Sequence, residues 1–289
     1  GRLKTFKSPS ENSSSIRLDS GVQEGGEISM YYDPMIAKLI SYGKDRDDAC
    51  LKLSSALDTF FISGLETNIA FVNSVLNNKK FLSGNITTAF LEEEYPKGYS
   101  GLLKSKSKLF LISLVALAME AIKKYRNQNL TAETCVVIIK KLDFTISYKM
   151  VYNQTKNIYD FSIIFKEQSY DFSIKWDIGY PLLSISMDKH TSILQVTNDT
   201  SKYRIKHAGF DIYATVREND IYKLSKLIPK KAKNNLSKLL LSPMPGQVVK
   251  VCVQENQKIN SGDDLIILDA MKMENILKAD KDAVIKKIH

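Results

Sequence analysis

The sequence predicts an α+β protein of several domains: an α+β domain, an antiparallel β-barrel around one long helix, and a small β-sandwich at the C-terminal end. Three observations lead to this prediction. A chain of 289 residues is long enough for two or three domains. Its apolar residues recur at helical spacing over residues 47–61 and 67–76 and with a strand period of two from residue 144 onward. Residues 241–289 contain a weak internal repeat.

Residues 1–100 combine strand-like and helical segments. The stretch 21–40 begins with glycine turns and continues into strand-like residues. Asp33-Pro34 then predicts the start of a helix, because proline suits a first helical turn. Residues 47–61 and 67–76 carry apolar side chains at helical spacing, which predicts two further helices. Together these segments indicate one α+β domain.

Residues 101–228 are predicted to form a helix enclosed by a barrel. The run Leu109–Met119 is almost wholly apolar, but it has about half the length that a membrane-spanning helix needs, and lysines flank it. We therefore expect a helix buried on all sides in a soluble domain. From Phe144 onward short alternating runs predict an antiparallel sheet. Closing that sheet around the helix would remove its open edges.

The two halves of residues 241–289 repeat with an offset of 36 residues, so that Val248 aligns with Val284. This repeat predicts a small two-fold β-sandwich, with Lys272 at the tip of the hairpin that joins the halves. Counterparts of residues 254–268 are missing from the second half, so we expect the sandwich to be incomplete at its C-terminal end. Four apolar residues should then be exposed: Val248, Val251, Ile266 and Ile267.

The composition narrows the classes of function. Lys and Arg number 41 against 32 Asp and Glu, a net charge of +9, but they are spread along the chain. The basic stretch 229–240 has no interleaved aromatic residues, so we interpret it as a solvated linker and expect no nucleic-acid site. Three scattered cysteines (Cys50, Cys135 and Cys252) and only three histidines predict no disulfide framework and no metal site, and they favour a reducing compartment.

The segment Ala270–Met273 (AMKM) is the strongest candidate for chemistry. Lys272 lies between two methionines, and the segment SPMPG precedes it at residues 242–246. An amine on an exposed tight turn can be modified by an enzyme without unfolding of the domain, and it can then carry a bound group between distant sites. The alternative is an ordinary solvated lysine, and the flanking residues argue against it.

PMPG followed by AMKMEN resembles the biotin carboxyl carrier domain of biotin-dependent carboxylases. In that family the lysine between the two methionines carries biotin in amide linkage, which implies covalent biotin on Lys272. Lipoyl carrier domains share the fold, but they usually place an acidic residue before the lysine, where this chain has Met271.

The resemblance covers nearly the whole chain and is weakest over residues 130–235. The segments RLDSG, YYDPMIAKLISYG and GLETNIAF, which begin at residues 17, 31 and 64, resemble the C-terminal subdomain of biotin carboxylase. This resemblance implies that Arg17 lies beside the biotin ureido ring, where a guanidinium would stabilise negative charge developing on oxygen. The structural alternative is an arginine that pairs with Asp19 in a strand.

The helix and barrel resemble the linking domain of propionyl-CoA carboxylase alpha subunits. The chain is thereby divided into a biotin carboxylase C-terminal subdomain (1–100), a linking domain that contacts another subunit (101–228), a basic linker (229–240) and a biotinyl domain (241–289). The combination of these regions in this order points to the propionyl-CoA enzyme.

The resemblance also implies an activity. As part of an acyl-CoA carboxylase, the chain would serve ATP- and bicarbonate-dependent carboxylation of biotin and carriage of the carboxyl group to a carboxyltransferase beta subunit. No phosphate-binding loop is present, so ATP and Mg²⁺ are expected to bind a part upstream of Gly1, and this fragment alone should be inactive. Expected partners are the beta subunit, in a hetero-oligomer, and a biotin protein ligase.

Several alternatives stay open at this point. The chain could belong to a methylcrotonyl-CoA or acetyl-CoA carboxylase, or it could be a non-catalytic biotinyl carrier protein. A basic nucleic-acid-binding protein is disfavoured, and neither nucleic acid nor a membrane is expected as a partner. The start GRLKTFKSPS carries no targeting signal. The expected location is the bacterial cytoplasm, or the mitochondrial matrix in a eukaryote.

Overall fold

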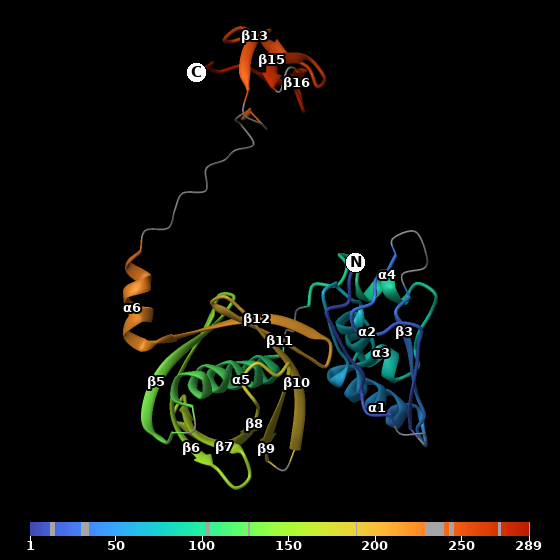
Figure 1. Ribbon diagram of the computed structural model, residues 1–289, viewed down its shortest axis with the longest axis vertical. Helices are drawn as coiled ribbons and strands as arrows, with labels where there is room; N and C mark the ends of the chain where they lie inside the picture. The colour runs from blue at the N-terminus through green and yellow to red at the C-terminus, as the bar shows by residue number, and fades with distance from the viewer. Residues whose placement is uncertain are drawn as a thin grey trace. The chain divides into compact units, whose positions relative to one another are not determined.

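The computed structural model describes residues 1–11, 15–29, 35–101, 105–126, 128–188, 190–228, 240–242, 246–270 and 273–288. These residues belong to two compact units, Gly1–Ile228 and Pro229–His289 (Figure 1). The predicted domain boundary near residue 100 therefore lies within the first unit. The predicted linker, 229–240, lies outside the described residues except for Leu240.

The N-terminal part of the first unit is an α+β domain, as predicted. Its elements are β1 (Thr5–Lys7), β2 (Ile16–Ser20), β3 (Ala37–Ser41), α1 (Arg46–Thr59), β4 (Phe61–Ser63), α2 (Ile69–Leu76), α3 (Lys79–Leu82) and α4 (Phe90–Glu94). β1 pairs with β4, and β2 with β3, both antiparallel. The Asp45 side chain accepts a hydrogen bond from the Asp48 backbone N–H at 2.8 Å and so caps the start of α1. Cys50, Leu57 and Leu76 form the buried core between α1 and α2.

The predicted helix after Asp33-Pro34 is wrong. Residues Ala37–Ser41 form strand β3, and Pro34 itself lies outside the described residues. The register pairs Leu39 with Leu18 of β2, and Leu39 packs against the core formed by α1 and α2. Pairing with a strand and burial of alternate side chains therefore decide this segment, against the local helix signal.

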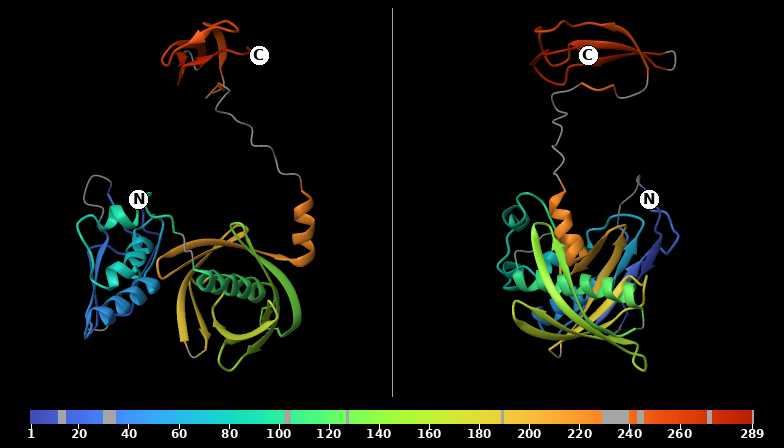
Figure 2. Two further views of the ribbon diagram at one scale, coloured as in Figure 1. Left: turned by 180° about the vertical axis from the view of Figure 1, so that it is seen from behind. Right: turned by 90° about the vertical axis from the view of Figure 1, so that its left-hand side faces the viewer.

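The C-terminal part of the first unit is a closed barrel of eight antiparallel strands, which confirms the predicted architecture (Figure 1; Figure 2). Its strands are β5 (Leu130–Ile139), β6 (Leu142–Asn153), β7 (Ile158–Phe165), β8 (Gln168–Lys175), β9 (Leu182–Met187), β10 (His190–Asp199), β11 (Lys202–His207) and β12 (Phe210–Glu218). β12 pairs with β5 and β9 with β10, so the sheet closes without an open edge. Ile146, Tyr148 and Met150 of β6 are buried in alternation, as the period of two predicted.

Helix α5 (Lys106–Tyr125) runs through the barrel and fills its interior. Ile112, Leu114 and Leu117 are at most 1% exposed, and most of the helix between Ile112 and Ile122 is buried. The strands of the barrel thus bury this apolar helix, as predicted. In the part of the chain that the structure describes, no helix combines the length and the apolar character needed to cross a membrane.

The C-terminal end of α5 is fixed to the barrel wall by a polar cluster around Glu133. Lys124 donates to Glu133 at 2.8 Å, and the hydroxyls of Tyr125 and Tyr148 donate to the other carboxylate oxygen at 2.7 and 2.8 Å. Burial alone would raise the pKa of Glu133, but these three donors outweigh it and hold the pKa below its ordinary value. The carboxylate therefore stays charged and joins the helix to β5 and β6.

A short helix, α6 (Asn219–Leu227), follows the barrel and was not predicted from the sequence. The Tyr222 hydroxyl bonds to Asp143 at the start of β6, which holds the helix against the barrel. Ile221, Leu224 and Leu227 on this helix are exposed. They recur at intervals of three residues, so the helix has an apolar face, and this face lies open to solvent.

The described residues of the second unit include five short strands in two sheets. They are β13 (Gln247–Val251), β14 (Lys258–Ile259), β15 (Asp264–Ala270), β16 (Met273–Lys278) and β17 (Ala283–Val284). One sheet has the order β13-β15-β16, and β14 pairs with β17 in the other. A small core lies between them, formed by Val253, Ile259, Leu265 and Ala279.

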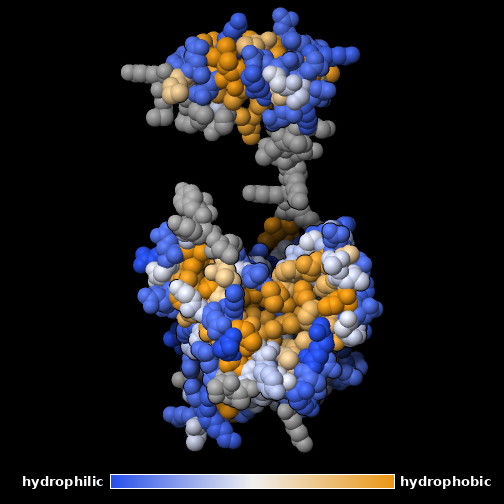
Figure 3. Space-filling view, turned by 90° about the vertical axis from the view of Figure 1, so that its right-hand side faces the viewer, coloured by the Kyte–Doolittle hydropathy of each residue, from blue (hydrophilic) through white to orange (hydrophobic). Residues whose placement is uncertain are grey.

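Apolar side chains lie open on the surface of this second unit (Figure 3). Val248 and Val251 are 53% and 40% exposed, as predicted. Ile266 and Ile267 are half-buried, so the expected exposure is found for only two of the four residues. The first unit also shows a broad apolar area on the face drawn in Figure 3.

Candidate functional site

The hairpin β15–β16 carries the segment that the sequence analysis singled out. Ala270 and Met273 form the last pair of its ladder, next to the pair Asp269–Glu274. Met271 and Lys272 join these two paired strand ends in the sequence and lie outside the described residues. By its position in the sequence, Lys272 is thus one of the two residues that link the strands of a β-hairpin.

The second half of the sequence signal meets this hairpin in space. Gln247, which directly follows the segment SPMPG, pairs with Asp269, one residue before Ala270. Pro243, Met244 and Pro245 themselves lie outside the described residues. The strand that follows SPMPG is therefore paired with the strand that leads into AMKM.

The described end of the hairpin is open to solvent. Met273 is 66% exposed, and the side chains of Asp269 and Glu274 are also exposed. A modifying enzyme could approach this described end without breaking any pair of the ladder.

Arg17 lies on β2, opposite Ile40 of β3. Its guanidinium contacts Asp19 through Nε at 3.1 Å and through Nη2 at 3.2 Å. The two side chains are 68% and 51% exposed, so the pair contributes little to stability. The structural alternative from the sequence analysis, an arginine that pairs with Asp19, is thus present in the fold. It leaves part of the guanidinium free to donate to a ligand, because the group carries five N–H donors.

An open cavity of about 640 Å³ borders the β2–β3 pair. Residues 18–22 and 35–38 line it, and Asp19 and Lys38 face each other across the two strands. A carboxylate and an ammonium group on one rim can hold a small polar molecule by charge and by hydrogen bonds. Among the described residues, no group of His, Cys, Asp and Glu is arranged to hold a metal ion.

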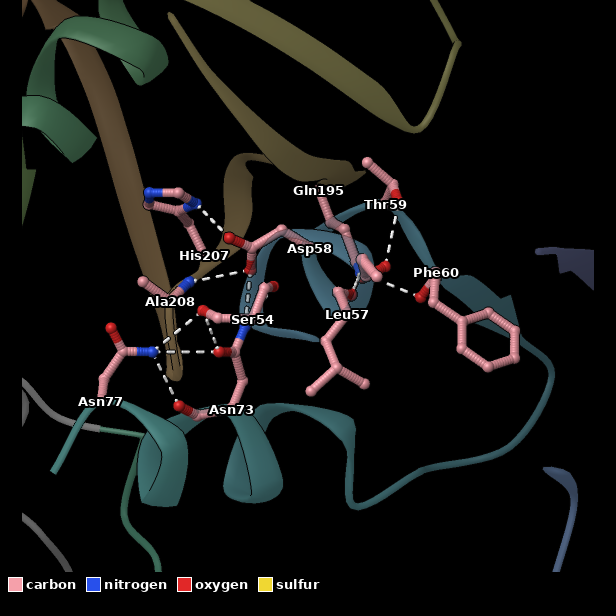
Figure 4. Close-up of polar contacts among 11 residues, drawn as sticks. Ser54, Leu57, Asp58, Thr59, Phe60, Asn73, Asn77, Gln195, His207 and Ala208 are labelled. Carbon is pink, nitrogen blue, oxygen red and sulfur yellow. Dashed lines mark hydrogen bonds and ion pairs between the residues drawn. The ribbon is translucent and has the colours of Figure 1, made fainter. Parts of the chain in front are cut away.

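The structure also reveals a polar cluster that the sequence analysis missed. Asp58, His207 and Gln195 meet where the α+β domain contacts the barrel (Figure 4). Asp58 and Gln195 are each 7% exposed. One signal existed, since an acidic residue in the last turn of a helix faces the negative end of the helix dipole and needs a partner.

Comparison with known families assigns all three regions of the chain. The biotin carboxylase C-terminal domain matches residues 1–93, the propionyl-coenzyme A carboxylase BT domain matches residues 115–231, and the biotin-requiring enzyme domain matches residues 238–289. Three consecutive regions of the chain are therefore similar to domains of biotin-dependent carboxylases. Within that class, its domains and their order correspond to the C-terminal region of propionyl-CoA carboxylase alpha chains.

Curated relatives match along the whole chain. The propionyl-CoA carboxylase alpha chain of Ruegeria pomeroyi is 33% identical over 100% of this chain and 46% of its own length. The human mitochondrial alpha chain is 31% identical over 100% of this chain and 41% of its own length. The rat methylcrotonoyl-CoA carboxylase alpha subunit is 28% identical over 95% of this chain and 40% of its own length. The chain thus spans less than half the length of these relatives.

Among solved structures, the biotin carboxylase domain of the Hydrogenobacter thermophilus 2-oxoglutarate carboxylase, in complex with MgADP, ADP and bicarbonate, is 35% identical over 32% of this chain and 20% of its own. The TM-score of that match is 0.31. A single-chain, multi-domain long-chain acyl-CoA carboxylase is 17% identical over 100% of this chain and 17% of its own, also with a TM-score of 0.31.

Proposed function

We propose that this chain is the biotin-carrying part of an acyl-CoA carboxylase alpha chain and that biotin is attached to Lys272. The observation that carries the proposal is the hairpin β15–β16, whose paired ends Ala270 and Met273 are joined by Met271 and Lys272. When bound, biotin would accept a carboxyl group at one site and release it at another. The chain's own contribution is to hold the amine at an exposed hairpin end, supported by β13.

Two lysines of one hairpin provide a matched test. The chain is expressed with a biotin protein ligase and probed with streptavidin as wild type, Lys272→Arg and Lys278→Arg. Lys278 lies at the far end of β16, 61% exposed and 3.5 Å from Asp264. We expect Lys278→Arg to bind streptavidin like the wild type and Lys272→Arg not to bind. Retained binding by Lys272→Arg would show that another residue is modified.

We assign to Arg17 a role in the carboxylation of biotin. Its guanidinium is exposed on β2 and carries N–H donors, so it can donate to an oxygen on which negative charge develops. The neighbouring cavity, with Asp19 and Lys38 on its rim, could hold the ring system of biotin or bicarbonate. ATP and Mg²⁺ would bind in the preceding part of a longer alpha chain.

The proposed acyl substrate is propionyl-CoA, and the proposed partner is a carboxyltransferase beta subunit that contacts the barrel. The match to the BT domain and the higher identity to propionyl-CoA carboxylase alpha chains support this assignment over the methylcrotonoyl-CoA alternative. Copurification with tagged alpha chain from the source organism, followed by acyl-CoA-dependent carboxylation assays, tests both points. Recovery of a methylcrotonoyl-CoA-specific beta subunit would contradict the substrate assignment.

A reducing compartment is part of the proposal, with the bacterial cytoplasm preferred over a mitochondrial matrix. All three cysteines, Cys50, Cys135 and Cys252, have free thiols, which is compatible with that location. Fractionation of the source cells with an antibody to the chain would test it, and recovery in a secreted fraction would contradict it.

A further inference from the structure

The turn between β11 and β12 enters the α+β domain at the carboxyl end of α1 (Figure 4). Asp58 of α1 accepts a hydrogen bond from the Ala208 backbone N–H at 2.8 Å. Its second oxygen lies 2.7 Å from His207 Nδ1, an ion-pair contact by distance without the alignment of a hydrogen bond. Within its own domain Asp58 accepts one further bond, from Asn73 Nδ2 at 2.8 Å.

This carboxylate depends on the barrel for its partners. A buried charge is costly unless it is paired, and at a helix C-terminus it also faces the negative end of the dipole. Asp58 is 7% exposed, and the barrel supplies the backbone donor and the only imidazole it contacts among the described residues. Without the barrel, Asp58 would keep only the amide of Asn73 as a bonded side-chain partner.

Gln195 of β10 makes the reciprocal contact. Its Nε2 donates to the carbonyl oxygens of Leu57 and Phe60 at 3.1 and 3.0 Å. These carbonyls lie at the end of α1, where helical partners run out. The barrel therefore caps the helix of its neighbouring domain, and Gln195 is buried by doing so.

Backbone packing closes the contact. A Cβ atom at Gly209 would lie 2.3 Å from Ser74 Cα and 2.4 Å from Ser74 N of α2, so only glycine fits there. On the other side, the Tyr99 hydroxyl donates to the Gly209 carbonyl at 2.9 Å. The turn is thus held between α2 and the segment that leads to the barrel.

We infer that this junction, formed by Asp58, Gln195, His207, Ala208 and Gly209, joins the α+β domain and the barrel into one rigid and cooperative body. The inference goes beyond the carrier role, because it concerns how a domain of the carboxylation half is coupled to the domain that contacts the other subunit. A partner bound to the barrel would thereby hold the α+β domain in a fixed position.

The single tryptophan of the chain makes the coupling measurable. Trp176 belongs to the barrel core, so its fluorescence follows unfolding of the barrel. Leu76→Ala removes a buried side chain of α2 that belongs to the core of the other domain. In the 289-residue chain, we expect this change to lower the thermal midpoint read at Trp176 by about 5–15 °C. An unchanged midpoint at Trp176, together with faster hydrogen exchange in α1 and α2, would overturn the inference.

Gly209→Ala should abolish that transmission. It forces the turn away from Ser74, after which Leu76→Ala should no longer move the midpoint at Trp176. Gly84→Ala is the matched control, since Gly84 has a φ of +74° against +80° at Gly209 but no atom within 4 Å of the added Cβ. Leu76→Ala is then measured in both backgrounds. If it lowers the midpoint at Trp176 as much in the Gly209→Ala variant as in the Gly84→Ala variant, the junction does not couple the domains. If Gly209→Ala does not fold, Gln195→Ala replaces it. Leu76→Ala must then lower the midpoint at Trp176 less in the Gln195→Ala variant than in the unmodified chain, or the inference is wrong.

Discussion

Replacement of Leu117 by alanine tests whether the barrel is held together by the helix inside it. Leu117 lies in the middle of α5 and is 1% exposed. Truncating a buried leucine typically costs about 2.7–5.0 kcal/mol, and the cost rises with the size of the cavity that remains. The wall around Leu117 is a closed ring of hydrogen-bonded strands, so it cannot collapse into the hole. We therefore expect a loss of about 4 kcal/mol, in the upper half of that range.

The assay is urea unfolding followed by the fluorescence of Trp176, which is 6% exposed in the barrel core. The slope against urea should be unchanged, because the surface exposed on unfolding is nearly the same. Leu51→Ala is the control: the same truncation in α1, at a side chain that is 67% exposed, should change stability by about 0.5 kcal/mol or less. A loss below about 1 kcal/mol for Leu117→Ala would refute the view that α5 forms the core of a closed barrel.

Three further predictions concern single side chains. The fold lowers the pKa of Glu133, so its carboxylate stabilises the protein above the unfolded pKa of about 4.3, and this stabilisation is lost as the pH falls through the folded pKa. Glu133→Gln should therefore reduce the loss of unfolding free energy at acid pH, measured by urea unfolding. An unchanged pH dependence would contradict this. Burial raises the pKa of the Cys135 thiol to about 12, and Cys50 is buried too, so iodoacetamide at pH 8 should modify the half-exposed Cys252 first; equal rates at all three would be the contrary result. Arg17→Ala in a complete alpha chain should lower biotin carboxylation by about 10²–10³ while the melting temperature stays nearly constant, and a loss of activity that only follows the folded fraction would remove this role.

The barrel and its helix could be predicted from the sequence because their signals are local. An apolar run marks α5, a period of two marks β6, and burial then follows that period. The segment Ala37–Ser41 could not be predicted, because its strand depends on pairing with β2, about 20 residues away along the chain, and on packing of Leu39 against α1. The local signal Asp33-Pro34 indicated the start of a helix, and the pairing and packing that form the strand are not visible in the sequence.

The candidate sites divide in the same way. Lys272 was found by its neighbours in the sequence, and the pairing of Ala270 with Met273 agrees with the expected hairpin. The junction could not be found, since Asp58 lies 150 residues from Ala208, and Gln195 lies 138 residues from Leu57. Only the folded chain brings these polar groups together, and only their burial shows that they must be paired.

The central claim is that one lysine of this chain carries biotin, and peptide mass spectrometry tests it most directly. The protein, coexpressed with a biotin protein ligase, is digested, and every lysine-containing peptide is searched for the mass of an added biotinyl group. We predict the modification in a single peptide, with fragment ions that place it on Lys272 between Met271 and Met273. Full sequence coverage with an unmodified Lys272, or with biotin on another lysine, would contradict the account.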